Sequence, residues 1–356
     1  MARARRSLEG MGMNGRGPDG SEHDWSGHRV LVTGATGIVG SALVARLLDA
    51  GAAVVTLIRD WDPQSELIRS GNVHRTSVVS GALEEYAAVE RAINEHETDT
   101  VFHLGAQTIV GTALRNPLPT FEANIRGTYH LLEACRVHAG LVSRVVVASS
   151  DKAYGEAVTL PYTEDTPLNG RHPYDVSKSC ADLLSLTYAH TYGLPVSVAR
   201  CGNIYGPGDL NWSRIVPGTI RAALQDQPVV LRSDGLMIRD YVFVEDVVSA
   251  YMTLAACTPQ SGVRGEGFNF SPGEPLTVQE VVRATLDVMG RLELAPTTAG
   301  NARAEIQAQH LDSSRARARL GWAPGHTLPE GLKATVPWYR DLLHAGASAP
   351  LLRNGA

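Results

Sequence analysis

Residues 28–40 read HRVLVTGATGIVG, a short apolar run rich in β-formers that ends in three glycines, Gly34, Gly37 and Gly40. The helical pattern SALVARLLDAG follows directly, so the glycines stand where a strand gives way to a helix. In such a turn the first glycine permits a tight bend, and the second lets the backbone approach a pyrophosphate. The third lets helix and strand pack closely, and the free N–H groups of the helix start favour the phosphates. The stretch therefore predicts a dinucleotide-binding turn.

Outward from this turn, apolar runs typical of buried strands alternate with helical patterns. The strand-like runs are AAVVTLI (52–58), TDTVFHLGA (98–106), SRVVVASS (143–150) and LPVSVARCG (194–202), and the helical patterns lie near 84–96, 117–139 and 174–192. Continuous apolar strands that alternate with helices indicate a parallel sheet covered on both faces. We predict an α/β fold, a Rossmann-type doubly wound parallel sheet with a smaller C-terminal substrate-binding lobe.

The composition changes along the chain suggest four parts. Residues 1–27 are rich in Gly, Arg and Ser and predict a disordered tail. Residues 28–205 predict the dinucleotide-binding domain, to which segments of the C-terminal part return. Residues 206–342 predict a lobe that is mainly substrate-binding and contains a helix capped by Thr277, and 343–356 predict a flexible tail. The expected ligand site is the cleft between lobe and sheet.

The overall composition excludes several functional classes. The net charge is −5, and no basic stripe indicates nucleic acid or a membrane surface as a partner. No uninterrupted apolar run approaches the roughly 20 residues of a membrane span. The histidines and cysteines lack the spacing of metal ligands, so we predict no metal. The four cysteines form no CxxC pair and are typical of buried, reduced thiols in a cytoplasmic protein.

Tyr174 and Lys178 are four residues apart, so they share one face of a predicted helix. We expect the ammonium group to lower the pKa of the phenol from its usual value of about 10. Tyr174 would then accept the proton of a hydroxyl group, and Ser150, at the end of a strand, would hydrogen-bond that hydroxyl. The alternative interpretation is a packed tyrosine and a solvated lysine. His103 in VFHL is expected to pack or hydrogen-bond within the sheet.

The motifs GATGIVG, VFHLGAQ, YDVSK, RDYV and LGWAP together resemble the extended short-chain dehydrogenase/reductase superfamily, within it the NAD-dependent epimerase/dehydratase family, over about residues 28–340. The resemblance implies an enzyme that binds NAD or NADP tightly and recycles it. The implied cofactor contacts are Gly34, Gly37, Ile38, Gly40, Arg59, Gly105, Ala106, Tyr174 and Lys178. Ile58 stands where relatives carry an acid for the ribose. Arg59 would pair with a 2′-phosphate, which slightly favours NADP, whereas Asp60 would reach a ribose of NAD.

Asp151 and Lys152 directly follow Ser150, and this pair resembles the sugar-nucleotide 4,6-dehydratases, notably the CDP-glucose 4,6-dehydratases and the inverting UDP-N-acetylglucosamine dehydratases. The chain as a whole resembles the CDP-glucose and GDP-mannose 4,6-dehydratases most. The resemblance implies that oxidation at sugar carbon 4 makes the carbon 5 proton acidic. Lys152 in its neutral form would remove that proton, and Asp151 would protonate the leaving hydroxyl of carbon 6. The stored hydride would return to carbon 6. The alternative is a surface ion pair between Asp151 and Lys152.

The resemblance also implies the substrate side of the site. Gln107 would line the sugar pocket, and Asn203, Arg214 and Arg239 would hold the ribose and pyrophosphate, because arginine forks suit phosphate oxygens. The expected partners are a nucleotide sugar, whose base and hexose stay open, and a second copy of the chain, joined through the helices near 117–139 and 174–192. An NDP-sugar 4-epimerase or reductase is the alternative function, and a non-catalytic dinucleotide-binding regulatory protein is a remote one.

Overall fold

The computed structural model describes residues 15, 22–231, 233–294, 296–298 and 306–348. Residues 1–14, 16–21 and 349–356 of the two expected tails lie outside this part. The end of the expected N-terminal tail is packed, because Trp25 is 1% exposed and its ring lies 6.0 Å from that of Phe102. The C-terminal helix α12 (Leu328–Ser348) continues past residue 342, where we expected a flexible tail to begin.

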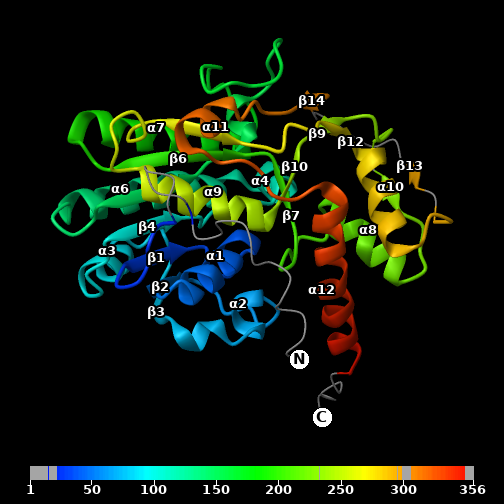
Figure 1. The fold of residues 1–356 in the computed structure, drawn as a ribbon, viewed down its shortest axis with the longest axis horizontal. Helices are drawn as coiled ribbons and strands as arrows, with labels where there is room; N and C mark the ends of the chain where they lie inside the picture. The colour runs from blue at the N-terminus through cyan, green and yellow to red at the C-terminus, as the bar shows by residue number, and fades with distance from the viewer. Residues whose placement is uncertain (1–14, 16–21, 232, 295, 299–305, 349–356) are drawn as a thin grey trace.

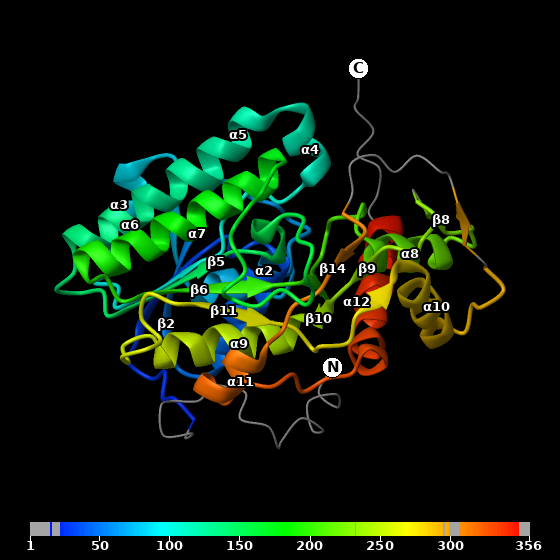
Figure 2. The same cartoon turned by 90° about the horizontal axis from the view of Figure 1, so that it is seen from above.

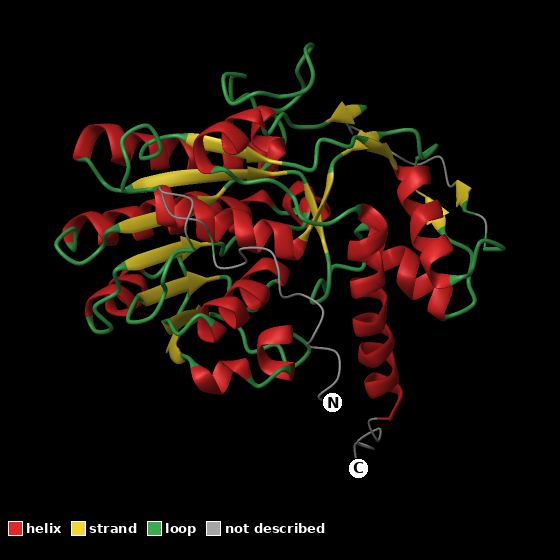
Figure 3. Ribbon diagram, viewed as in Figure 1, coloured by secondary structure: helices red, strands yellow, loops and turns green. Residues whose placement is uncertain are grey.

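A seven-stranded sheet forms the larger part of the molecule (Figures 1 and 3). All neighbouring strands are parallel, as predicted for a doubly wound fold. The order is β3 (Ser77–Ser80), β2 (Ala53–Ile58), β1 (Arg29–Thr33), β4 (Thr100–His103), β5 (Arg144–Ala148), β6 (Val196–Cys201) and β11 (Gly267–Phe270). The order reverses between β1 and β4. In such sheets ligands bind at this reversal, beyond the carboxyl ends of the strands.

Helices cover both faces of the sheet, as Figure 2 shows. One face carries α3 (Tyr86–Asn94), α6 (Gly127–Val137) and α7 (Pro173–Tyr192), and the other carries α1 (Ile38–Asp49), α9 (Val244–Cys257) and α11 (Ser314–Leu320). Val30 and Val32 of β1 belong to the apolar cluster of the second face, whereas Leu31 between them belongs to that of the first. Burial on both sides explains why the strands read as continuous apolar runs.

The helix expected over 117–139 is interrupted. The structure has α4 (Val110–Arg115) before it, then α5 (Pro117–Phe121), a π-helical turn η2 (Glu122–Arg126) and α6. Asn124 in this turn is buried, and its side-chain nitrogen donates to Ser177 Oγ at 2.9 Å and to the Gln107 oxygen at 3.1 Å. Such turns are frequent at functional sites, and the apolar spacing of the sequence does not reveal them.

The remaining elements gather beside the carboxyl edge of the sheet (Figure 1). They are α8 (Ile215–Leu224), α10 (Val278–Met289) and α12, with the short strands β7 (Asn203–Tyr205), β8 (Val230–Leu231), β9 (Ile238–Arg239), β10 (Tyr241–Phe243), β12 (Leu276–Thr277), β13 (Thr297–Thr298) and β14 (Ala308–Gln309). Thr277 caps α10 as predicted, in a capping box with Glu280. Smaller turns are α2 (Glu66–Arg69) and the 3₁₀ turns η1 (Asn72–Arg75) and η3 (Asp151–Tyr154). Within the described part, no helix combines the length and apolarity of a membrane span.

Candidate active site

The glycine turn after β1 is shaped by close backbone contacts. Gly34 has a φ of +67°, and a Cβ atom on it would lie 2.7 Å from the Gly105 nitrogen. A Cβ atom on Gly40 would lie 2.1 Å from the Gly34 oxygen, so helix α1 packs against the turn only with glycine there. Gly37 caps α1, whose first residue is Ile38. The open first turn of α1 fits the pyrophosphate of a dinucleotide.

Hydrogen bonds to Thr33 hold the loop after β4 next to the glycine turn. Thr33 Oγ1 accepts hydrogen bonds from the backbone nitrogens of Leu104 and Gly105 at 3.1 and 3.0 Å, which places Gly105 and the following Ala106 beside Gly34. His103 bonds to Thr33 Oγ1 at 2.9 Å and to Thr128 Oγ1 at 3.0 Å. Burial lowers the pKa of His103 to about 3, so this histidine is neutral. The bond to Thr33 lies within the sheet, as predicted, and the bond to Thr128 joins the sheet to helix α6.

Arg59 lies just beyond the end of β2, next to β1. Its Nε donates to Asp60 Oδ2 at 2.6 Å, and both side chains are largely exposed. An acid at this place of a dinucleotide fold binds ribose hydroxyls, and an arginine accommodates a 2′-phosphate. Both groups are present and pair with each other, so the geometry suits NAD and NADP alike.

The turn η3 after β5 holds the acid and the base. Ser150 caps the turn, since its Oγ accepts from the Lys152 nitrogen at 3.3 Å and donates to Asp151 Oδ1 at 2.8 Å. Asp151 is 2% exposed, whereas Lys152 extends to Gln309 and donates to its Oε1 at 2.9 Å. The carboxyl group of Asp151 and the amine of Lys152 therefore point to different partners. They do not form the surface ion pair that was the alternative interpretation.

Tyr174 and Lys178 lie buried in the first turns of α7. Lys178 Nζ donates to the Ala148 oxygen at 2.8 Å, and burial lowers the pKa of Lys178 to about 8. Burial likewise raises the pKa of Tyr174 to about 12; Arg214 and a hydrogen bond with Ser150 act in the opposite direction. The expected lowering of the Tyr174 pKa by Lys178 is wrong for the protein by itself, because burial of the phenol is the larger effect.

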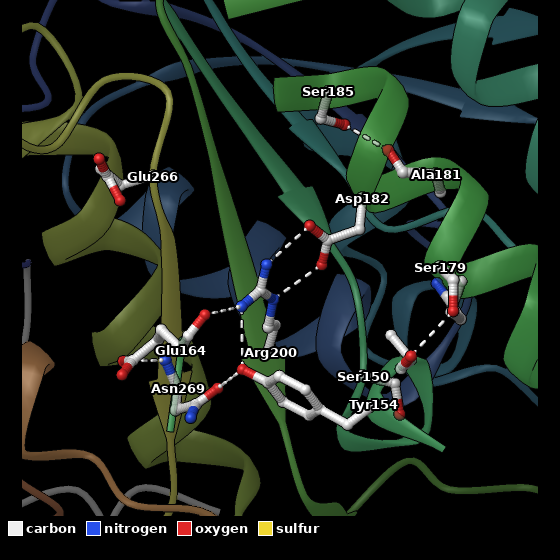
Figure 4. Close-up of polar contacts among 12 residues, drawn as sticks. Ser150, Tyr154, Glu164, Ser179, Ala181, Asp182, Ser185, Arg200, Glu266 and Asn269 are labelled. Carbon is white, nitrogen blue, oxygen red and sulfur yellow. Dashed lines mark hydrogen bonds and ion pairs between the residues drawn. The ribbon is translucent and has the colours of Figure 1, made fainter. Parts of the chain in front are cut away.

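A buried polar network holds η3 against α7 and the sheet (Figure 4). Arg200 of β6 donates from Nε and Nη2 to both carboxylate oxygens of Asp182, at 2.8 and 2.9 Å. Its Nη1 donates to the hydroxyl of Tyr154 at 2.9 Å, and this hydroxyl donates to Asn269 Oδ1 at 2.7 Å. Tyr154 is the last residue of η3 and Asp182 lies one turn after Lys178. The network thus fixes the base-carrying turn relative to the helix of Tyr174.

Asn124, Asp182 and Arg200 were not predicted from the sequence, although one signal was present: an arginine inside the apolar run VSVARC requires a buried partner. A second signal supports two residues that were predicted. The chain has only three lysines, Lys152, Lys178 and Lys333, among 32 Lys and Arg residues, and two of the three lie in the candidate site.

The candidate substrate residues come from several elements. Arg214 precedes α8, donates from Nη1 to Asp209 Oδ2 at 3.1 Å, and lies near enough to Tyr174 to affect its pKa. Arg239 of β9 is buried and donates to the oxygens of Ile238 and Ile306 at 2.7 and 2.6 Å.

Asn203 and Gln107 are also held by the backbone. Asn203 Nδ2 donates to the Asp240 oxygen at 3.3 Å, and Gln107 Oε1 accepts from the Ile109 nitrogen at 2.8 Å. Hydrogen bonds of Asn124 thus connect Gln107 to Ser177 of α7, and the charge of Arg214 lowers the pKa of Tyr174. Arg59 stands apart, beyond β2 on the other side of β1.

Comparisons with known proteins agree with this architecture. A family model described as GDP-mannose 4,6 dehydratase matches residues 31–335. The CDP-glucose 4,6-dehydratase of Salmonella typhimurium is 30% identical over 332 residues, covering 89% of this chain and 91% of that protein. The solved dTDP-glucose 4,6-dehydratase of Streptomyces venezuelae, with NAD bound, has a TM-score of 0.78 and 28% identity, covering 88% of this chain and 97% of that one. The UDP-glucose 4-epimerase of Thermotoga maritima, with UDP-glucose, has a TM-score of 0.80 and 29% identity, covering 88% and 99%. The resemblance expected from the motifs is confirmed.

Proposed function

The chain belongs to the GDP-mannose 4,6-dehydratase family, and on this basis we propose that it is a redox-neutral, NAD(P)-dependent nucleotide-sugar 4,6-dehydratase. Its reaction converts an NDP-hexose to an NDP-4-keto-6-deoxyhexose and water. The observation that carries the proposal is the arrangement of Asp151 and Lys152. A buried carboxyl group and a separately held amine follow Ser150 directly and stand beside Tyr174.

The binding roles follow from where the side chains lie. The glycine turn, the start of α1 and the loop of Gly105 and Ala106 hold the dinucleotide, with Arg59 at the adenosine ribose. Arg214, Arg239 and Asn203 hold the ribose and pyrophosphate of the nucleotide sugar, and Gln107 lines the sugar pocket. NAD or NADP held by these residues would supply the hydride acceptor for carbon 4 and the hydride donor for carbon 6, so that no reduced cofactor would be consumed.

Tyr174, Lys178 and Ser150 serve the oxidation at carbon 4. Ser150 hydrogen-bonds the carbon 4 hydroxyl, and Tyr174 accepts its proton as the carbonyl forms. Because the pKa of Tyr174 is about 12, ionisation needs further positive charge near the phenol. Arg214 already acts in this direction. A protonated Lys178 and the positive charge of a bound nicotinamide would add to it.

Asp151 and Lys152 serve the elimination. The new carbonyl acidifies carbon 5, Lys152 takes the proton from it as the C–H bond breaks, and the electron pair forms the double bond. The carbon 6 C–O bond breaks at the same time, and Asp151 gives its proton to the departing oxygen, which leaves as water. Lys152 then protonates carbon 5 while carbon 6 is reduced. Acid and base must act on neighbouring carbons, and adjacent residues with divergent side chains suit that need.

Several features support finer parts of the proposal. Leu118 of α5, Leu183 of α7 and Val137 of α6 are 63%, 54% and 55% exposed, and they suit a homodimer joined by these helices. The four cysteines are free thiols, which suits the cytoplasm. We propose residues 28–205 as mainly the dinucleotide domain and 206–342 as mainly the substrate lobe.

The test is a mass-spectrometric assay with purified protein. CDP-glucose, GDP-mannose, dTDP-glucose, UDP-glucose and UDP-N-acetylglucosamine are each incubated with NAD and with NADP. Loss of one water molecule from one substrate, without accumulation of reduced cofactor, is the expected result and names the base and hexose. No water loss from any of them would contradict the proposal.

A 4-epimerase is the second candidate function. The solved UDP-glucose 4-epimerase of Thermotoga maritima shares this fold over nearly its whole length. Ser150, Tyr174 and Lys178 alone are sufficient for oxidation and re-reduction at carbon 4. A product of unchanged mass that is a new sugar isomer would identify this activity.

A further inference from the structure

The base that we assign to the elimination is a lysine whose side chain needs a second anchor. Lys152 is fixed at its backbone by η3, but four rotatable bonds separate that backbone from the amine, and freezing them costs about 2 kcal/mol. A general base must stand within about 3 Å of the proton that it removes. The hydrogen bond of 2.9 Å from Lys152 Nζ to Gln309 Oε1 supplies such an anchor from the other side of the site.

Gln309 is itself held firmly. It is 1% exposed and lies in β14, where it pairs in register with Arg239 of β9. The next residues bond on both sides: the His310 oxygen accepts from the Tyr162 nitrogen at 2.9 Å, and the Leu311 nitrogen donates to Asp240 Oδ2 at 2.6 Å. A side chain on so constrained a strand has a defined position. Its strand partner Arg239 is a candidate pyrophosphate ligand.

The chemistry of Gln309 also suits a base. A lysine ammonium has only donors, so the amide oxygen must face it. An amide carries no charge, and it therefore orients the amine while opposing the loss of its proton less than a carboxylate would. Asp175 of α7 lies near enough to Lys152 for the lysine to affect its pKa, and Asp151 adjoins Lys152 in the chain and accepts a hydrogen bond from Ser150. Gln309 thus gives Lys152 an uncharged hydrogen-bond partner.

We propose that Gln309 is a positioning residue for Lys152, holding the amine through its side-chain oxygen in the place from which it removes the carbon 5 proton. The inference rests on the proposed dehydratase function for its catalytic meaning. The contact itself does not depend on that function and is measurable without turnover.

The experiment compares Gln309→Leu and Gln309→Glu with the wild type. Gln307→Leu and Gln307→Glu are the matched controls, because Gln307 is exposed and lies two residues earlier in the same segment. Reductive ¹³C-methylation labels the chain's three lysines, and Lys152→Arg assigns the Lys152 signal in NMR spectra. In Gln309→Glu the titration midpoint of that signal is expected to rise by about 1 pH unit, because a carboxylate within hydrogen-bonding distance favours the ammonium. The Gln307 variants are expected to leave it unchanged.

Kinetics of the same variants supply the second readout. Gln309→Leu is expected to lower kcat about 10²-fold with little change in KM, as for a misplaced catalytic group. In Gln309→Glu the pH profile of kcat is expected to move to higher pH. An unchanged Lys152 titration in both Gln309 variants overturns the inference whatever the activity. A moved titration in a protein that releases no water from any sugar nucleotide keeps the contact and refutes the proposed function instead. Wild-type kinetics in Gln309→Leu would also overturn the positioning role.

Discussion

The side-chain nitrogen of Lys178 donates a 2.8 Å hydrogen bond to the backbone oxygen of Ala148, and this buried contact ties helix α7 to the end of β5. Burial lowers the pKa of Lys178 to about 8, so the folded protein releases this proton at a lower pH than the unfolded chain does. Burial of the protonated Lys178 therefore lowers the stability of the folded protein, and the size of this loss depends on pH.

Stability should thus rise with pH between about 8 and 10.5, since the unfolded chain binds a proton on Lys178 there that the folded chain has lost. Below this window the penalty is fully present. We expect Lys178→Met to lack this dependence, so that wild type gains about 2 kcal/mol relative to the variant from about pH 7 to about pH 10. Urea unfolding of both proteins at the two pH values measures this gain. A constant stability difference would show that Lys178 is not shifted by burial.

Tyr174→Phe removes the hydroxyl that accepts the substrate proton. We expect kcat to fall by about 10²- to 10⁴-fold, the range for loss of a general base, while dinucleotide affinity changes little. Tyr188→Phe on the same helix is the control, because its hydroxyl bonds to Glu133 away from the site, at 3.1 Å. Steady-state rates and calorimetric titration with NAD check both variants. Equal rates in the two would remove Tyr174 from the reaction.

Gly40→Ala places a methyl group 2.1 Å from the Gly34 oxygen and must push α1 away from the turn. We expect NAD affinity to fall at least about tenfold, which corresponds to about 1.4 kcal/mol. Gly140→Ala is the matched control, since a Cβ atom there meets nothing within 4 Å. Calorimetric titration of the folded variants with NAD is the measurement. Unchanged affinity in Gly40→Ala would show that the turn does not hold the dinucleotide.

Removing one partner of the buried Arg200–Asp182 ion pair should destabilise the protein more than removing both partners. Arg200→Met leaves a carboxylate buried without its partner, and we expect a loss of about 3–5 kcal/mol in the free energy of unfolding. The double variant Arg200→Met/Asp182→Leu leaves no unpaired charge and is expected to lose less than Arg200→Met alone. Urea unfolding of the two single variants and the double variant forms the cycle. Strict additivity would contradict direct coupling within the network.

The sheet and the dinucleotide turn were predictable because their causes are local in sequence. Gly34 and Gly40 are needed where backbone packs closely against backbone, and strands buried on both faces must be apolar throughout. Tyr174 and Lys178 share a helix face at any position of that helix in the fold. Pattern and spacing alone therefore predicted these parts.

The remaining features depend on contacts between distant segments. Lys152 and Gln309 are 157 residues apart, and Arg200 and Asp182 meet only once strand and helix are packed. The π-helical turn of Asn124 leaves no mark on the apolar spacing. The Tyr174 pKa was predicted in the wrong direction because sequence shows the neighbouring lysine but not the degree of burial.

Running the reaction in D₂O tests the central claim most directly. Protons on the Lys152 amine exchange with solvent, so a base that removes and restores the carbon 5 proton introduces deuterium there. We expect a wild-type product that has lost one water molecule and carries one deuterium at carbon 5. Lys152→Met should oxidise carbon 4 without eliminating, so that reduced cofactor accumulates on the enzyme. A product of unchanged mass without deuterium, formed equally fast by Lys152→Met, would contradict the dehydratase account.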